Sequence, residues 1–114
     1  MKQIRFRYEE GQKLIKEFEK ELASAGIADG TIIAVVGALS DFSIVTIRQN
    51  SEKVPPEHFE KKFDKKVELT GNGVVRDGKA HIHMTGGTEG GDALSGHLVE
   101  GTVTYFVEII VLIG

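Results

Sequence analysis

The chain has 114 residues, of which 40% are hydrophobic and 27% charged, a composition typical of an ordinary globular domain. It contains no cysteine, which excludes disulfides and thiolate metal sites. The formal net charge of −3 disfavours nonspecific DNA binding, because affinity for nucleic acid comes largely from basic residues that neutralise phosphates. We expect one soluble, cytoplasmic domain over residues 1–114, since neither a secretory signal nor a membrane-spanning stretch is recognised.

The N-terminal part of the chain predicts a strand followed by a helix. Apolar residues alternate with polar ones in Lys2–Glu9, the period of a half-buried strand. From Gln12 onward the apolar residues recur at helical spacing and charged residues occupy the other faces. Gly26 is well placed to end this helix, because glycine accepts the left-handed conformation common after a last helical turn.

Two strands are predicted next, at Thr31–Leu39 and Asp41–Arg48. The short break at Ser40–Asp41 favours an antiparallel return between them. Thr31–Leu39 is apolar on both faces, and a strand without a polar face is typically covered on both sides. We therefore expect a helix to cover one of its faces and another layer to cover the other.

The middle of the chain is polar and less regular. Gln49–Glu57 contains both prolines and is interpreted as a loop. Phe59 and Phe63 lie four residues apart among charged residues, which fits a short helix beginning near Pro56. Beta structure is the alternative for this segment.

A β-hairpin is the strongest local prediction. Asp77-Gly78 lies between two strand-like segments within Lys66–Thr85, and an Asp-Gly pair supplies the positive φ angles that a two-residue turn requires. A glycine-rich loop is expected at Gly86–Asp92. The last segment, Val99–Ile113, leaves almost no polar face, so that one helix can hardly cover the apolar strands of this chain. An exposed apolar surface of this kind favours oligomerisation, and the alternative is a tightly built monomer in which both apolar strands lie centrally.

Three of the four histidines are close in the sequence: His81, His83 and His97. Residues two apart in a strand point to the same face, so His81 and His83 are expected to present their imidazoles together. His97 follows the glycine-rich loop, where a returning strand would bring it alongside. Three converging neutral imidazoles are a standard ligand set for Zn²⁺ or a similar divalent metal. The alternative is a polar strand face whose histidines bond to neighbouring groups; His58 is predicted to be merely exposed.

The cupins also carry an HxH pair on a strand. Their first motif requires a glycine before the pair and a glutamate after it, whereas Val75, Gly87 and Thr88 occupy the corresponding positions here. Their second motif, with its proline and asparagine, is absent. A cupin is therefore disfavoured.

Several segments occur in an order that resembles the PPC domain, the plants-and-prokaryotes-conserved domain, over essentially the whole chain. They are Ala34–Phe42, Leu69–Gly73, His81-Ile82-His83, Gly96–Gly101 and Glu108-Ile109. The resemblance implies an α/β (α+β) fold, with a mostly antiparallel β-sheet of roughly seven strands flanked by helices in a single domain. It also implies a homotrimer, and a metal site formed by His81, His83 and His97.

Plant members of the family carry an AT-hook beside this domain, and the family is often labelled DNA-binding for that reason. No Arg-Gly-Arg-Pro core occurs in this sequence, and the chain is acidic. DNA is therefore a disfavoured partner.

Three hypotheses of function follow from these features. The first is a homotrimeric binding module with a three-histidine zinc site and a regulatory role, which we favour over an enzyme. The second is a metal-dependent enzyme that uses a histidine-bound metal and its water, with Glu89, Asp92 or Glu100 as the acid or base. The third is a DNA-binding or transcription-associated protein without an AT-hook.

Overall fold

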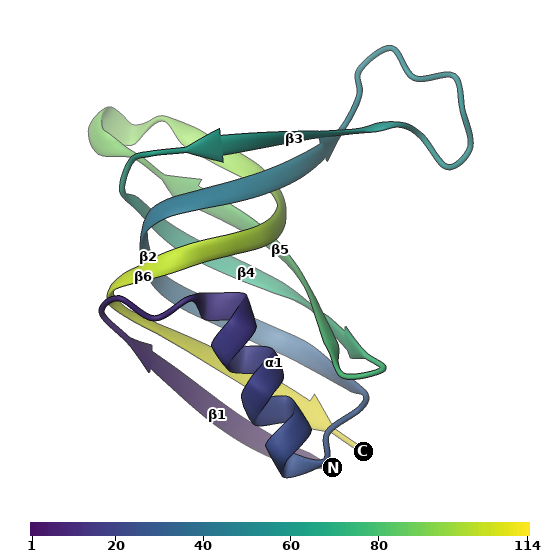
Figure 1. Ribbon diagram of the computed structural model, residues 1–114, viewed down its shortest axis with the longest axis vertical. Coiled ribbons are helices and arrows are strands. Elements are labelled where there is room, and N and C mark those ends of the chain that lie inside the picture. Colours follow the sequence, from purple (N-terminus) through teal and green to yellow (C-terminus); the bar gives the residue numbers. More distant parts are fainter.

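Residues 1–114 are all described by the computed structural model, which contains one α-helix, one short 3-10 helix and six strands (Figure 1). The helices are α1 (Leu14–Ala25) and η1 (Glu89–Gly91). The strands are β1 (Lys2–Glu9), β2 (Gly30–Ile47), β3 (His58–Phe63), β4 (Val67–Arg76), β5 (Lys79–Gly87) and β6 (Ala93–Ile113). Every strand pairing is antiparallel, which confirms the predicted fold class.

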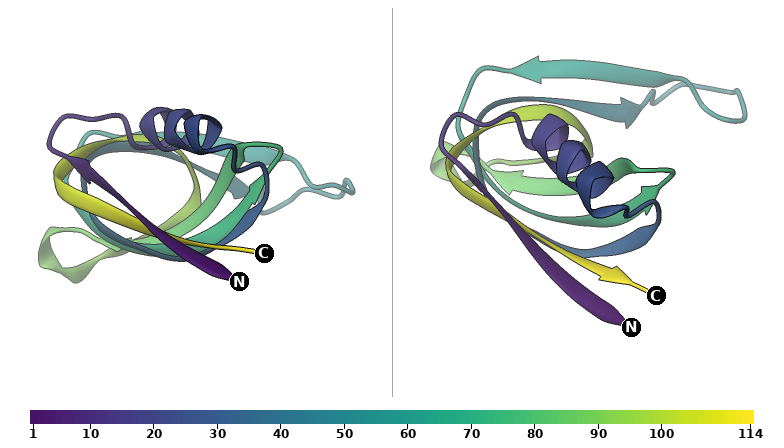
Figure 2. Two further views of the ribbon diagram at one scale, coloured as in Figure 1. Left: turned by 90° about the horizontal axis from the view of Figure 1, so that it is seen from below. Right: turned by 60° about the horizontal axis from the view of Figure 1, so that its bottom comes forward.

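Two long strands organise the sheet, because each of the other strands pairs with β2, β6 or a strand attached to them. The strand order is β1-β6-β5-β4-β2-β3, and β6 also pairs directly with β2. This additional pairing closes the sheet on itself, as the ring of strands in Figure 2 shows. The interior is filled by 23 buried apolar residues that form one cluster. β1 and β3 extend the sheet on the outer edges of β6 and β2.

Bulges allow the long strands to bend around this core. The register between β2 and β6 shifts at four places, one of them between Gly37 and Ala38. Here Tyr105 and Phe106 are extra residues on β6, and Tyr105 adopts a left-handed conformation with φ 67°. Gly37 has φ 150°, and a Cβ at this position would overlap the carbonyl oxygen of Phe106. A bulge of this kind bends the strand and strengthens its twist.

The single α-helix packs on the closed sheet between β1 and the β4–β5 turn (Figure 1). Its apolar face buries Leu14, Ile15, Phe18 and Leu22, as its sequence period predicts. Gly26 ends the helix in the left-handed conformation, φ 69°, which confirms the prediction. No helix of this protein has both the length and the apolar character needed to cross a membrane.

One prediction about the strands was wrong, and one alternative that the sequence left open is decided. There is no break at Ser40: β2 runs without interruption from Gly30 to Ile47, because its pairing with β6 continues on both sides of that residue. The segment of Phe59 and Phe63 is not a helix but strand β3, whose edge pairs with β2. The ring of Phe63 stacks on that of Phe42, with centroids 5.0 Å apart, and this tertiary contact decides in favour of the strand.

Not every apolar residue of β2 is covered within one chain. Ile33 is 45% exposed and Val36 46% exposed, on the outside of the closed sheet. Tyr105 of the β6 bulge is 76% exposed. The expected cover for both faces of Thr31–Leu39 is therefore incomplete in the single chain.

Replacement of Gly37 by alanine is expected to lower the free energy of unfolding by roughly 3 kcal/mol or more, because the new Cβ overlaps backbone and the φ angle is unfavourable for alanine. Gly87→Ala is the matched control: nothing lies within 4 Å of a Cβ built there. Urea unfolding of both variants measures the difference. Equal stability of the two would contradict the close β2–β6 approach.

Candidate functional site

The β4–β5 hairpin places two of the candidate histidines. Asp77 and Gly78 form its turn with φ 51° and 75°, as the Asp-Gly signal predicts. The register pairs Val74 with His81 and Asn72 with His83, which follows from a two-residue turn. A Cβ at Gly73 would overlap the carbonyl oxygen of His81, so glycine at this position lets β4 approach β5 closely.

The third histidine joins them across the β5–β6 pairing. His97 is directly opposite His83, and the two ring centroids lie 5.8 Å apart. The rings of His81 and His97 lie 5.5 Å apart, and both contacts are edge-to-face. Ala80, Ile82 and Met84 alternate with these histidines and are buried, so the imidazoles project from the outer face of the closed sheet.

The β5–β6 ladder ends at the His83–His97 pair, and α1 fills the space beyond it. Glu19 of the helix accepts a hydrogen bond from the backbone N–H of Ala80 through Oε2, at 2.9 Å. Glu100 of β6 accepts hydrogen bonds from the N–H groups of Ile15 and Lys16, at 2.8 and 3.0 Å. Two carboxylates thus hold α1 against β5 and β6, in the opening that forms where these two strands are no longer paired.

A cavity of about 900 Å³ adjoins the histidines. Its lining includes all four histidines of the chain and one carboxylate. The full set is Ile15, Glu19, Val45, Thr46, Ile47, His58, Ala80, His81, His83, Ser95, Gly96, His97, Leu98 and Val99. His58 and Glu19 were not identified from the sequence, because their approach to this cavity depends on β3 pairing with β2 and on the packing of α1.

The three acids considered as catalytic candidates do not line this cavity. Glu100 is near it but is engaged by the first turn of α1. Glu89 belongs to η1 and Asp92 follows it, in the connection between β5 and β6. These acids are near the histidines in the sequence. In the folded chain Glu89 and Asp92 lie outside the cavity, and Glu100 is hydrogen-bonded to α1.

The environment of His97 favours its neutral form. Burial lowers the pKa of His97 below its ordinary value of 6.5, and the nearby charges of His81, His83 and His58 lower it further. A neutral imidazole is the form that binds a metal ion. The electrostatics of the cluster therefore agree with the ligand chemistry that its composition suggests.

The geometry of the cluster agrees with a metal site only in part. Zn–N bonds of about 2.1 Å in tetrahedral arrangement place ring centroids about 5 Å apart, slightly less than the separations from His97. The side chains as they stand do not form a set of three metal ligands. The residue types fit zinc and the ring separations from His97 are close to those it requires, but the three side chains would have to shift to coordinate an ion.

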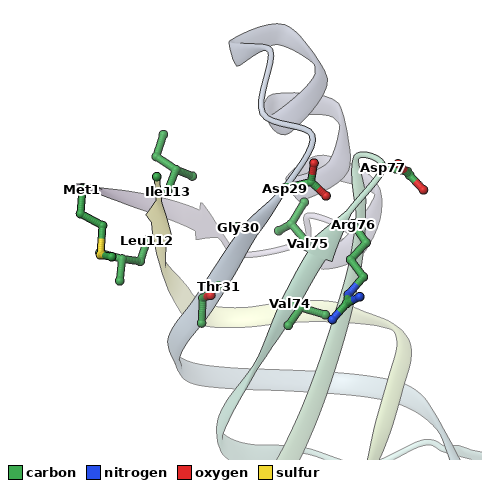
Figure 3. Close-up of a pocket in the computed structure, with 11 residues that line it drawn as sticks. Met1, Asp29, Gly30, Thr31, Val74, Val75, Arg76, Asp77, Leu112 and Ile113 are labelled. Atoms are coloured by element: carbon green, nitrogen blue, oxygen red, sulfur yellow. The ribbon is translucent and has the colours of Figure 1, made fainter.

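A second cavity, of about 540 Å³, opens near the chain termini (Figure 3). Its charged side chains include Asp29, Arg76 and Asp77. These three side chains point in different directions and do not converge on one point in Figure 3. This cavity therefore lacks the convergent polar groups of a binding site.

The fold is that of a known class of protein. The sequence matches the Plants and Prokaryotes Conserved (PCC) domain over residues 1–113, and the chain belongs to this family. The resemblance drawn from the sequence motifs is thereby confirmed. No curated protein matches the sequence.

Solved structures with the same fold include two archaeal proteins. A plant- and prokaryote-conserved (PPC) protein of Pyrococcus horikoshii superimposes with a TM-score of 0.82 and 27% identity, covering 100% of this chain and 80% of that one. A metal-containing protein of Archaeoglobus fulgidus gives a TM-score of 0.81 and 26% identity, covering 98% and 79%.

A bacterial structure provides a third match. This protein of Bacteroides thetaiotaomicron, provisionally described as DNA-binding, gives a TM-score of 0.81 and 19% identity, with 96% of this chain and 77% of that one covered. At that identity the likeness shows the fold alone.

Replacement of Glu100 by alanine is expected to lower the free energy of unfolding by about 1–2 kcal/mol, because two N–H groups at the start of α1 lose their acceptor. Lys13, the N-cap residue, makes no side-chain cap that could compensate. Thermal and urea unfolding measure this loss. Glu89→Ala, in the connection beyond β5, serves as the control, and an equally small effect of both substitutions would contradict the proposed role of Glu100.

The lowered pKa of His97 predicts a pH dependence of stability in the metal-free protein. The folded state binds fewer protons than the unfolded state, so the free energy of unfolding falls as the pH drops through 6.5 toward the folded-state pKa. Urea unfolding between about pH 8 and pH 5, with chelator present, measures the slope. His97→Gln is expected to flatten it; an unchanged slope would show that other groups are responsible.

Proposed function

We propose that this chain is a homotrimeric binding module that holds one divalent metal ion, Zn²⁺, through His81, His83 and His97. The observation that carries the proposal is the convergence of three imidazoles from β5 and β6 on one outer face, with ring centroids 5.5 and 5.8 Å apart around His97. Three histidines leave at least one coordination position of zinc open to water or a ligand. A bound zinc would therefore supply a positively charged, open coordination position for that water or ligand.

Further support comes from the protonation state of the cluster and from a relative. The lowered pKa of His97 favours the neutral imidazole that a metal requires. The Archaeoglobus fulgidus protein, 26% identical to this chain, is a metal-containing protein. We therefore extend metal binding to this chain as a proposal, with the three histidines as the ligands.

The homotrimer follows from the family resemblance, and exposed apolar side chains support self-association. Ile33, Val36 and Tyr105 are between 45% and 76% exposed on the outside of the sheet. Large apolar side chains in such positions gain free energy when a second protein surface covers them. A second copy of the chain is the partner we propose for them.

A binding role is preferred to catalysis because the carboxylate nearest the histidines already accepts a hydrogen bond within the protein. Glu19 is the only carboxylate that lines the histidine cavity, and its Oε2 already accepts a hydrogen bond from Ala80. A hydrolytic enzyme would need an acid or base within reach of the metal-bound water, and this carboxylate is not free for that role. DNA binding is supported only by the descriptions of two structures at 18% and 19% identity, and the net charge of −3 disfavours it.

Elemental mass spectrometry of tag-free protein, purified without chelator and then dialysed against Zn²⁺, tests the metal site. We expect about one zinc per chain, and its loss in the His83→Ala variant. Thr85→Ala is the matched control, because Thr85 is the next residue of β5 on the same outer face. Zinc below stoichiometric amounts in the wild-type protein would overturn the metal proposal.

Light scattering on the same samples tests the assembly separately. A mass of three chains supports the homotrimer, and a mass of one chain overturns it. Because zinc content and mass are independent readouts, failure of one proposal leaves the other decided on its own evidence.

A further inference from the structure

The cavity beside the histidine cluster is bounded by β3 as well as by β5 and β6. Strand β2 separates the two sides: on one edge Val45 is opposite His97, and on the other Ile47 is opposite His58. Cross-strand partners point to the same face of a sheet, and so do residues two apart in one strand. His58 and His97 therefore project from the same face, with the apolar side chains of Val45 and Ile47 between them.

The polar groups of this cavity differ in whether they are already engaged. Glu19 is bonded to the N–H of Ala80, and its other oxygen lies 3.8 Å from Lys79 Nζ. Ser95 shares a hydrogen bond with Thr85 at 3.2 Å. His58 makes no side-chain hydrogen bond or ion pair. The cavity thus contains unengaged imidazoles and no unengaged carboxylate.

We infer that this cavity binds a small organic carboxylate between His58 and the metal held by His81, His83 and His97, with its hydrocarbon part on Val45 and Ile47. The inference rests on the proposed zinc site and names its ligand class. A zinc ion with three neutral imidazoles keeps its positive charge and an open position, both of which favour an anionic oxygen ligand. The cavity volume of about 900 Å³ accommodates a small molecule.

His58 contributes specificity from the other side of the cavity. An imidazole carries at least one N–H donor in either protonation state, and a hydrogen bond to a carboxylate is stronger than one to a neutral acceptor. A neutral ligand of the same shape gains in full neither this charge-assisted hydrogen bond nor the attraction of the metal ion's positive charge.

Isothermal titration calorimetry of zinc-loaded protein with benzoate and with benzamide tests this inference, because the two probes share a shape and differ in charge. We expect benzoate to bind at least about tenfold more tightly than benzamide. His58→Ala should weaken benzoate binding about five- to tenfold and change benzamide binding little. The zinc content of each variant is measured first, so that a lost ligand is distinguished from a lost metal.

Lys61→Ala is the matched control. Lys61 is on the same strand as His58 and carries a positive charge, but it does not line the cavity. Benzoate affinity unchanged in Lys61→Ala and reduced in His58→Ala supports the inference. Equal reductions in both variants would show a general charge effect and overturn the role of His58.

The remaining outcomes separate this inference from the proposed function. Stoichiometric zinc with equal affinity for benzoate and benzamide overturns the inference alone. Benzoate affinity that is the same with and without zinc overturns the part assigned to the metal. Absence of zinc from the wild-type protein overturns the proposed function, and the inference with it.

Discussion

The direct pairing of β2 with β6 is the constraint on which the rest of this structure depends. It joins two strands that are far apart in the sequence and converts an open sheet into a closed one. Together with α1, the closed sheet encloses a single cluster of 23 buried apolar residues. The long strands meet this constraint by bending at bulges, where Gly37 allows the backbone of Phe106 to approach and Tyr105 accepts a left-handed conformation.

The same closure produces the histidine cluster. Pairing between β5 and β6 is limited to the part nearest their connection, because β6 then turns to follow β2 and later β1. His83 and His97 are the last pair of this short ladder, and His81 lies just beyond it. α1 occupies the resulting opening and is held by Glu19 and Glu100, whose carboxylates satisfy N–H groups that strand pairing or a helix cap would otherwise satisfy. The candidate site is therefore located where β5 and β6 stop pairing with each other.

The position of the site also explains which chemistry it favours. Carboxylates around the opening are engaged in holding the helix, and imidazoles remain available at the surface. An arrangement of hydrogen-bond donors and proposed metal ligands, without an unengaged carboxylate to repel a negative charge, favours the binding of an anion. Acidic composition of the whole chain and an imidazole-lined cavity are compatible, because local electrostatics depend on which charges are paired and not on their sum.

The sequence by itself determined the local elements whose signals are short-range. These include the amphipathic helix ending at Gly26, the Asp77-Gly78 hairpin with its register, and the presence of His81 and His83 on one face. The motifs also determined the family, since they extend over the whole chain. Tertiary structure alone decided that β2 continues through Ser40, that the segment of Phe59 is a strand, and that His58 and Glu19 reach the same cavity as His97. These features depend on pairing and packing between residues distant in the chain, and hydrophobic periodicity records only which faces are apolar, not what covers them.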